Sequence, residues 1–138
     1  MLLCLICQFK NERHIMYEFI HHYLQEGVDH FILIDDNSDD DYYQLNKDWI
    51  EDLIKKKILC IHNRKNLSKP QSDYNLHLNK IKKFDWLIVC DMDEFFFSIP
   101  VNSTLKSVLK NELSEYDNII VPWKVFINNT YYQPKSVI

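Results

Sequence analysis

Short apolar runs of strand length alternate along this chain with segments whose apolar residues recur at helical spacing. The runs cover residues 2–9, 30–34, 58–62, 85–90 and 118–125. Continuous apolar runs are typical of strands that are buried on both faces of a parallel sheet, because helices cover the two faces. The alternation therefore predicts an α/β fold, with a mostly parallel, Rossmann-like sheet flanked by helices and joined by right-handed crossovers.

The segments between these runs carry the helical pattern. Helices are expected at residues 14–26, 42–57, 72–83 and 104–114. Asn11 fits the N-cap of the first helix. Gly27 is the only glycine in the chain, and we expect it to end that helix in the left-handed conformation.

Length and charge limit the classes of protein to consider. With 138 residues the chain is expected to form a single domain, 1–138. Its net charge of −4, with acidic and basic residues mixed, argues against nucleic acid as a partner. The apolar start, residues 2–9, is far shorter than the roughly 20 residues of a membrane-spanning helix, and no signal peptide is visible. A cytoplasmic protein without a membrane span is therefore expected.

The four cysteines are interpreted as ordinary reduced thiols. Each lies in an apolar run, and no second cysteine or histidine pair has the spacing of a zinc site. Free cysteine packs as a small hydrophobic residue. We therefore expect Cys4, Cys7, Cys60 and Cys90 to be buried.

Polar clusters follow four of the predicted strands directly. They cover residues 8–12, 35–41, 64–69 and 91–94. In parallel sheets, ligands bind beyond the carboxyl ends of the strands, at a switch point in strand order. The four loops should therefore converge on one edge of the sheet and form a binding site there.

Asp91-Met92-Asp93 is the sharpest of these elements. Two carboxylates at positions i and i+2, where a strand opens into a turn, can hold one hard cation. Mn²⁺ or Mg²⁺ prefers such oxygen ligands together with substrate phosphates and water. The sequence therefore predicts a metal site at Asp91 and Asp93. Glu94 either orients an aspartate, binds the metal through water or is a solvated carboxylate.

The other loops have two interpretations each. Asp39, Asp40 and Asp41 fit turns and helix caps, whereas Asp35 or Asp36 could accept a hydrogen bond from a base or a ribose. In the basic loop, Arg64, Lys65 and Lys69 either meet phosphate or form a solvated surface. A calcium loop is disfavoured, because the glycine and the distal glutamate that such a loop needs are missing.

Taken in order, these residues resemble the opening of GT-A-fold glycosyltransferases, closest to the family-2-like and family-92-like group. The matching positions are 10–12, 18–20, His22, 27–31, Asp36-Asn37-Ser38-x-Asp40, Gln71, Trp86, 91–95, Pro122-Trp123 and Phe126. The resemblance spans most of the chain, so it is far more specific than Asp-x-Asp alone. It implies a GT-A-type fold and transfer of a sugar from a nucleotide-sugar donor, expected to be a UDP-sugar, to an acceptor hydroxyl, with Mn²⁺ or Mg²⁺ as cofactor.

The same resemblance implies roles for individual residues. Asp36 would contact the base, Asp91 the ribose or the metal, and Asp93 the metal. The remaining donor-binding residues would be Gln8, Phe9, Lys10, Gln71 and Met92. The motifs identify no general base, and Glu94 is the candidate.

Relatives in this group continue beyond the part that the chain matches, so the chain is expected to lack the usual acceptor-binding C-terminal half. A non-catalytic nucleotide-sugar-binding or interaction module is therefore the alternative function. The acceptor is unknown, whether glycan, protein or lipid, and exposed edge strands would allow a homodimer. A phosphatase of the aspartyl-phosphate type is disfavoured, because its motif follows the first strand and has a small polar residue where Phe95 stands.

Overall fold

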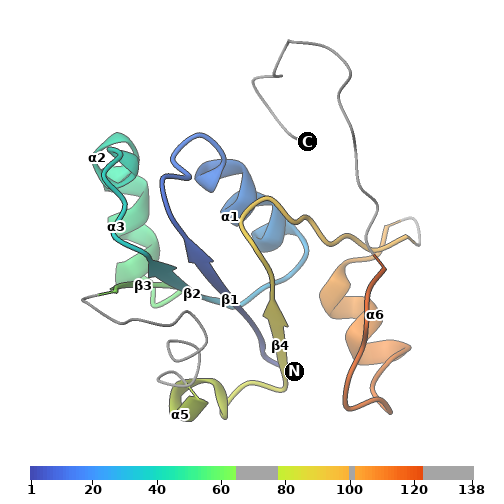
Figure 1. Ribbon diagram of the computed structural model, residues 1–138. Coiled ribbons are helices and arrows are strands. Elements are labelled where there is room, and N and C mark those ends of the chain that lie inside the picture. Colours follow the sequence, from blue (N-terminus) through green and yellow to red (C-terminus); the bar gives the residue numbers. More distant parts are fainter. Residues whose placement is uncertain (65–77, 100–101, 123–138) are drawn as a thin grey trace, which may run out of the picture.

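A computed structural model describes residues 1–64, 78–99 and 102–122 of the protein (Figure 1). In this part of the chain, parallel strands form one sheet in the order β3-β2-β1-β4. The strands are β1 (Leu3–Phe9), β2 (His30–Asp35), β3 (Leu59–Asn63) and β4 (Trp86–Val89). The predicted α/β fold with a parallel, Rossmann-like sheet is confirmed.

Strand β1 forms the centre of the sheet, because it pairs with β2 on one side and β4 on the other. Six of its seven residues are buried, as the continuous apolar run predicts. The register brings Phe9 beside Asp35, and Asp35 beside Asn63. Strands β1, β2 and β3 therefore end side by side, and the loops that follow them leave from the same edge.

Helices cover both faces of the sheet. They are α1 (Met16–Gln25), α2 (Tyr42–Leu45), α3 (Lys47–Lys55), α5 (Leu78–Ile81) and α6 (Leu105–Asn111). Figure 1 shows α1 and α3 side by side, and both contribute buried residues to the larger hydrophobic cluster, on which α6 also packs. On the opposite face, Ile81 of α5 packs on a smaller cluster of β1 and β2 side chains.

The first helix ends as predicted but begins differently. Gly27 adopts a φ of +91°, as expected of the residue that ends a helix. The Asn11 prediction is wrong: the N-cap of α1 is Ile15, which makes no side-chain capping bond. Asn11 instead has a φ of +58°, and its side-chain oxygen accepts a hydrogen bond of 2.9 Å from the Asp39 backbone N–H. A contact with a distant loop thus replaces the local cap.

Other element boundaries also differ from the prediction. The helix expected at 42–57 is split into α2 and α3 at Asn46, whose φ of −115° departs from helical geometry. Of the helix expected at 72–83, only Leu78–Ile81 is found, and residues 72–77 lie outside the described part. Residues 118–122 form no strand, and Ile120 is 90 % exposed. Residues 123–125 of that predicted strand are not described.

The cysteines are free thiols, three of them buried as predicted. Burial raises the pKa of Cys4 and of Cys90 to about 12. Cys60, on β3, is only half-buried, and its Sγ lies 2.9 Å from Nε2 of His62. Across the described ranges, no helix has the length and apolar character needed to cross a membrane.

Candidate functional site

The Asp-x-Asp segment forms a tight turn directly beyond β4. The backbone N–H of Glu94 donates to the carbonyl of Asp91 at 3.1 Å, and the backbone N–H of Asp91 donates to the Glu94 carboxylate at 2.9 Å. Met92 lies between them with 2 % exposure and packs in the main core, whereas Asp91 and Asp93 are exposed. The buried methionine therefore anchors the turn and leaves two carboxylates on its solvent side.

This donor set fits a hard divalent cation. Both exposed side chains offer only oxygen, which Mn²⁺ and Mg²⁺ prefer, and two carboxylates leave coordination positions for water and phosphate. A preformed cage of three or more histidine, cysteine or acidic side chains is not found among the described residues. The Glu94 carboxylate already accepts from the Asp91 backbone, so its visible role is to hold the turn.

Negative charge gathers at the end of the central strand. Burial is the main cause that raises the pKa of Cys7, and the nearby charges of Asp91, Glu12 and Asp93 raise it further. Acidic side chains from the loops after β1 and β4 therefore both influence the Cys7 thiol.

The ends of β1, β2 and β3 are joined by a side-chain network around Asp36. Arg64 donates to one Asp36 carboxylate oxygen at 2.9 Å, and the Gln8 amide donates to the other at 3.4 Å. The Arg64 side chain is only 8 % exposed, against 30 % for Asp36. The interpretation of Arg64 as solvated surface is therefore wrong. Lys65 and Lys69, the other cations of that loop, lie outside the described residues.

The neighbouring acidic residues hold the loop together. The buried Asp35 carboxylate accepts from the Ser38 backbone N–H at 2.8 Å and from the Tyr42 hydroxyl at 3.2 Å. Asp41 pairs with Arg13, and the hydrogen bond from this arginine lowers the pKa of the carboxyl group. Asp35 thus forms a turn, whereas Asp41, at the N-cap of α2, makes no side-chain capping bond, so the predicted cap is not formed there. Asp36 is left as the carboxylate at the predicted nucleoside side.

The remaining predicted donor-binding residues occupy different environments. Phe9 is buried and packs edge-to-face against Tyr42, with ring centroids 5.0 Å apart. Gln8 is half-buried and Lys10 is exposed. Gln71 lies outside the described residues. Met92 is buried, so its side chain is not open to a ligand.

Sequence reasoning missed the contacts that hold the segment after the turn. The Tyr23 hydroxyl donates to the carbonyl of Glu94 at 2.8 Å and accepts from the backbone N–H of Phe96 at 3.0 Å. Nε2 of His22 is 2.7 Å from the carbonyl of Phe96. Tyrosine on the apolar stripe of a helix was the available signal, because a buried hydroxyl usually needs a partner.

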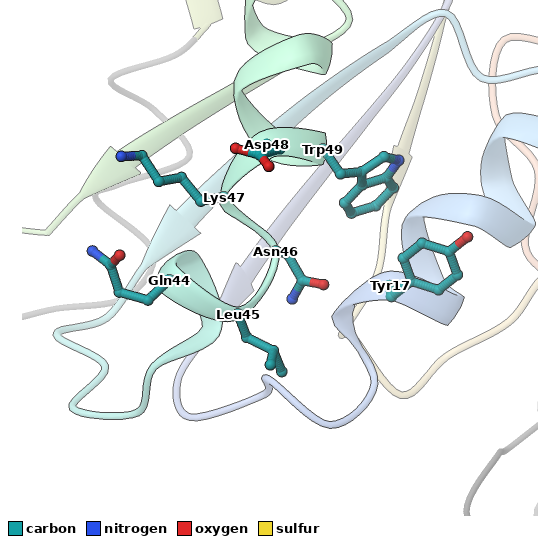
Figure 2. Close-up of a pocket in the computed structure, with 7 residues that line it drawn as sticks. All are labelled: Tyr17, Gln44, Leu45, Asn46, Lys47, Asp48 and Trp49. Carbon is teal, nitrogen blue, oxygen red and sulfur yellow. The ribbon is translucent and has the colours of Figure 1, made fainter.

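A shallow hollow of about 410 Å³ lies elsewhere, between the start of α1 and the α2–α3 junction (Figure 2). The rings of Tyr17 and Trp49 pack against each other in its lining, with centroids 4.9 Å apart, whereas Gln44 and Lys47 extend away from them. Its lining includes none of the predicted donor or metal residues. The hollow is therefore separate from the edge where the polar loops gather.

The comparison with protein-family models gives a match along almost the whole chain. The model that matches is that of glycosyltransferase family 92, over residues 1–137. A search of curated proteins found no match. The parallel sheet agrees with the predicted Rossmann-like fold, and the family match covers the same chain. The chain therefore belongs to glycosyltransferase family 92, whose enzymes transfer sugar from a donor to an acceptor.

Proposed function

We propose that this protein binds a UDP-sugar at the carboxyl edge of its sheet, through Mn²⁺ or Mg²⁺ held by Asp91 and Asp93, and transfers the sugar to an acceptor hydroxyl. One observation carries this proposal. A buried methionine and a reciprocal pair of hydrogen bonds fix a turn whose two exposed carboxylates lie at the end of β4, beside the central strand.

The spacing of the polar groups suits a nucleoside diphosphate. Strands β2 and β4 flank β1, so Asp36 and Asp91 leave the sheet about two strand spacings, roughly 10 Å, apart. A nucleoside placed on the Asp36 side would extend its diphosphate toward the aspartate turn. The cation would neutralise the charge that develops on the diphosphate when the sugar–oxygen bond breaks.

The network around Asp36 supports uridine as the nucleoside. Asp36 is paired with Arg64 and can only accept hydrogen bonds as a carboxylate, so the Gln8 amide must direct its NH₂ group toward Asp36. The amide oxygen of Gln8 is left as an acceptor. Acceptors on this side favour a base that presents an N–H donor, as the imide of uracil does. Lys10 and Gln71 are assigned to the donor from the family resemblance.

The Glu94 carboxylate closes the turn. The proposal therefore assigns Glu94 to holding the donor site and not to proton transfer. Binding of the donor without any turnover would favour the alternative, a nucleotide-sugar-binding module. Release of UDP from a UDP-sugar, with or without an added acceptor, would exclude that alternative.

Calorimetric titration of UDP tests the proposal. We expect binding in Mn²⁺, loss of binding in EDTA, and loss of binding in Asp93→Ala even with Mn²⁺ present. Asp117→Ala is the matched control, because Asp117 is an exposed aspartate outside the site. The proposal also expects UDP to bind more tightly than CDP. Absence of UDP binding under every condition, or full binding by Asp93→Ala, would refute it.

A further inference from the structure

The segment that follows the aspartate turn is held by a helix instead of a neighbouring strand. Residues 94–98 have no regular secondary structure. Three of the backbone polar groups of this segment nevertheless have side-chain partners on α1: the Glu94 carbonyl, the Phe96 N–H and the Phe96 carbonyl. We call their two partners, His22 and Tyr23, the α1 clamp.

Tyr23 uses both capacities of its hydroxyl in the α1 clamp. Its side chain is fully buried, and the hydroxyl donates to one backbone group while it accepts from another. Burial is the main cause that raises the pKa of this tyrosine, so the hydroxyl keeps its proton. His22 must carry its proton on Nε2 to donate to the Phe96 carbonyl.

Aromatic packing reinforces these hydrogen bonds. Phe95 lies between Glu94 and Phe96 in the chain. Its ring packs edge-to-face on those of His22 and Phe19, with centroids 5.2 Å and 6.0 Å away. Such edge-to-face pairs are favourable beyond the apolar area that they bury. The segment is therefore fixed to α1 both through its backbone and through a side chain.

Glu94 links the α1 clamp to the carboxylates. Its carbonyl is held by Tyr23, while its carboxylate accepts from the Asp91 N–H and its own N–H donates to the Asp91 carbonyl. A shift of Glu94 would therefore move Asp91 directly. Before the turn, β4 fixes the chain by pairing with β1. The turn is thus held from the sheet on one side and from α1 on the other.

We propose that Tyr23 and His22 are positioning residues, which hold the Asp91–Asp93 turn in the geometry that binds the cation and the donor diphosphate. The inference rests on the proposed function, because it concerns the same metal site. Groups that orient metal ligands without touching the metal typically change affinity by about 10–100-fold when they are removed. A tyrosine that only filled the core would change stability and leave affinity unchanged.

Tyr23→Phe tests this role, because it removes the hydroxyl and keeps the ring. We expect UDP titrated in Mn²⁺ to bind about 10–100-fold more weakly to this variant, in which the Phe96 N–H and the Glu94 carbonyl lose their partner. Ile50→Val is the control for stability, since it removes one methyl group from a buried position on α3 and should bind UDP as the wild type does.

Two further measurements separate positioning from core packing. His22→Ala should weaken UDP binding, whereas His22→Gln, whose amide can still donate to the Phe96 carbonyl, should restore most of it. Amide hydrogen exchange should become faster at Phe96 in Tyr23→Phe but stay unchanged at Phe31, which donates to Ile58 in the sheet region. The exchange measurement requires no ligand.

The outcomes distinguish this inference from the proposed function. Wild-type protein that fails to bind UDP in Mn²⁺ would overturn both. Wild-type binding together with unchanged affinity in Tyr23→Phe would overturn only the positioning role. Rapid exchange of the Phe96 amide in the wild type would also overturn it, because the hydrogen bond to Tyr23 would then not hold the segment.

Discussion

Replacement of Arg64 by methionine tests the network that joins the ends of three strands. Methionine keeps much of the apolar stem but removes the guanidinium group, which is almost fully buried and pairs with Asp36 at 2.9 Å. Removal of one partner of a buried ion pair costs about 3–5 kcal/mol, because the other charge is left without compensation. Asp36 is 30 % exposed, so water would compensate part of this loss. We therefore expect Arg64→Met to lower the free energy of unfolding by about 2–3 kcal/mol, in the range of a hydrogen bond to a charged group.

A double-mutant cycle isolates the pair itself. Urea unfolding of the wild type, Arg64→Met, Asp36→Asn and the double variant gives the coupling energy, which we expect to be about 1–2 kcal/mol. The Arg64 backbone N–H, which donates to the Asp35 carbonyl at 2.8 Å, is present in all four proteins. Lys47→Met is the control, because Lys47 is exposed and forms only a 3.9 Å pair with Glu51. It should change stability by less than about 0.5 kcal/mol.

One outcome of the double-mutant cycle would contradict the role of this ion pair. A coupling energy below about 0.3 kcal/mol, with the two single changes simply additive, would show that Arg64 and Asp36 do not depend on each other. The account of a fixed nucleoside side would then fail, even if the fold were unchanged. A coupling energy in the expected range would show that Asp36 is held in place before any ligand arrives.

Three further predictions concern other parts of the chain. Gly27→Ala should lower the free energy of unfolding, measured in urea, by about 1–3 kcal/mol, because φ is +91° and a Cβ there would lie 2.7 Å from Cβ of Lys106. An unchanged unfolding midpoint would contradict this strained geometry. Burial lowers the pKa of His30 below its usual value of about 6.5, so the unfolded chain takes up this proton first as the pH falls. The contribution of neutral His30 to the free energy of unfolding should therefore be complete above about pH 6.5 and decrease below it. Urea unfolding at pH 7.5 and 5.5 should show a smaller decrease in His30→Gln. Iodoacetamide should label the half-buried Cys60 first, as detected by mass spectrometry, since Cys4, Cys7 and Cys90 are buried. Early labelling of any of these three buried thiols would contradict the core described here.

Much of the fold could be predicted because its signals are local. A strand buried on both faces requires a continuous apolar run, and the runs at 2–9 and 30–34 correspond closely to β1 and β2. Gly27 was predictable for a similar reason, since the left-handed end of a helix favours glycine. The Asp-x-Asp turn could also be located, because it directly follows the run that forms β4.

The features that were missed depend on contacts between distant residues. The Asn11 side chain fits a helix cap equally well, but its contact is with Asp39 in the loop after β2. Tyr23 looks like one more apolar residue of an amphipathic helix, and its partners lie 71 and 73 residues further along the chain. A tyrosine hydroxyl on a buried face indicates that some partner is needed, but the sequence contains no local sign of which residues provide it. Such pairings appear only when the sheet order brings β4 and α1 together.

If the donor and its cation bind at the carboxyl edge of the sheet, a method that maps their position gives the most direct test. Mn²⁺ is paramagnetic and broadens the amide signals of nearby residues in the NMR spectrum of ¹⁵N-labelled protein. Addition of a small amount of Mn²⁺ with excess UDP should broaden the signals of residues 91–94 and of Gln8, with weaker effects at Asp36, and should leave Trp49 beside the separate hollow unchanged. Broadening centred on α3, or none at all in the turn after β4, would contradict the assignment of the donor site.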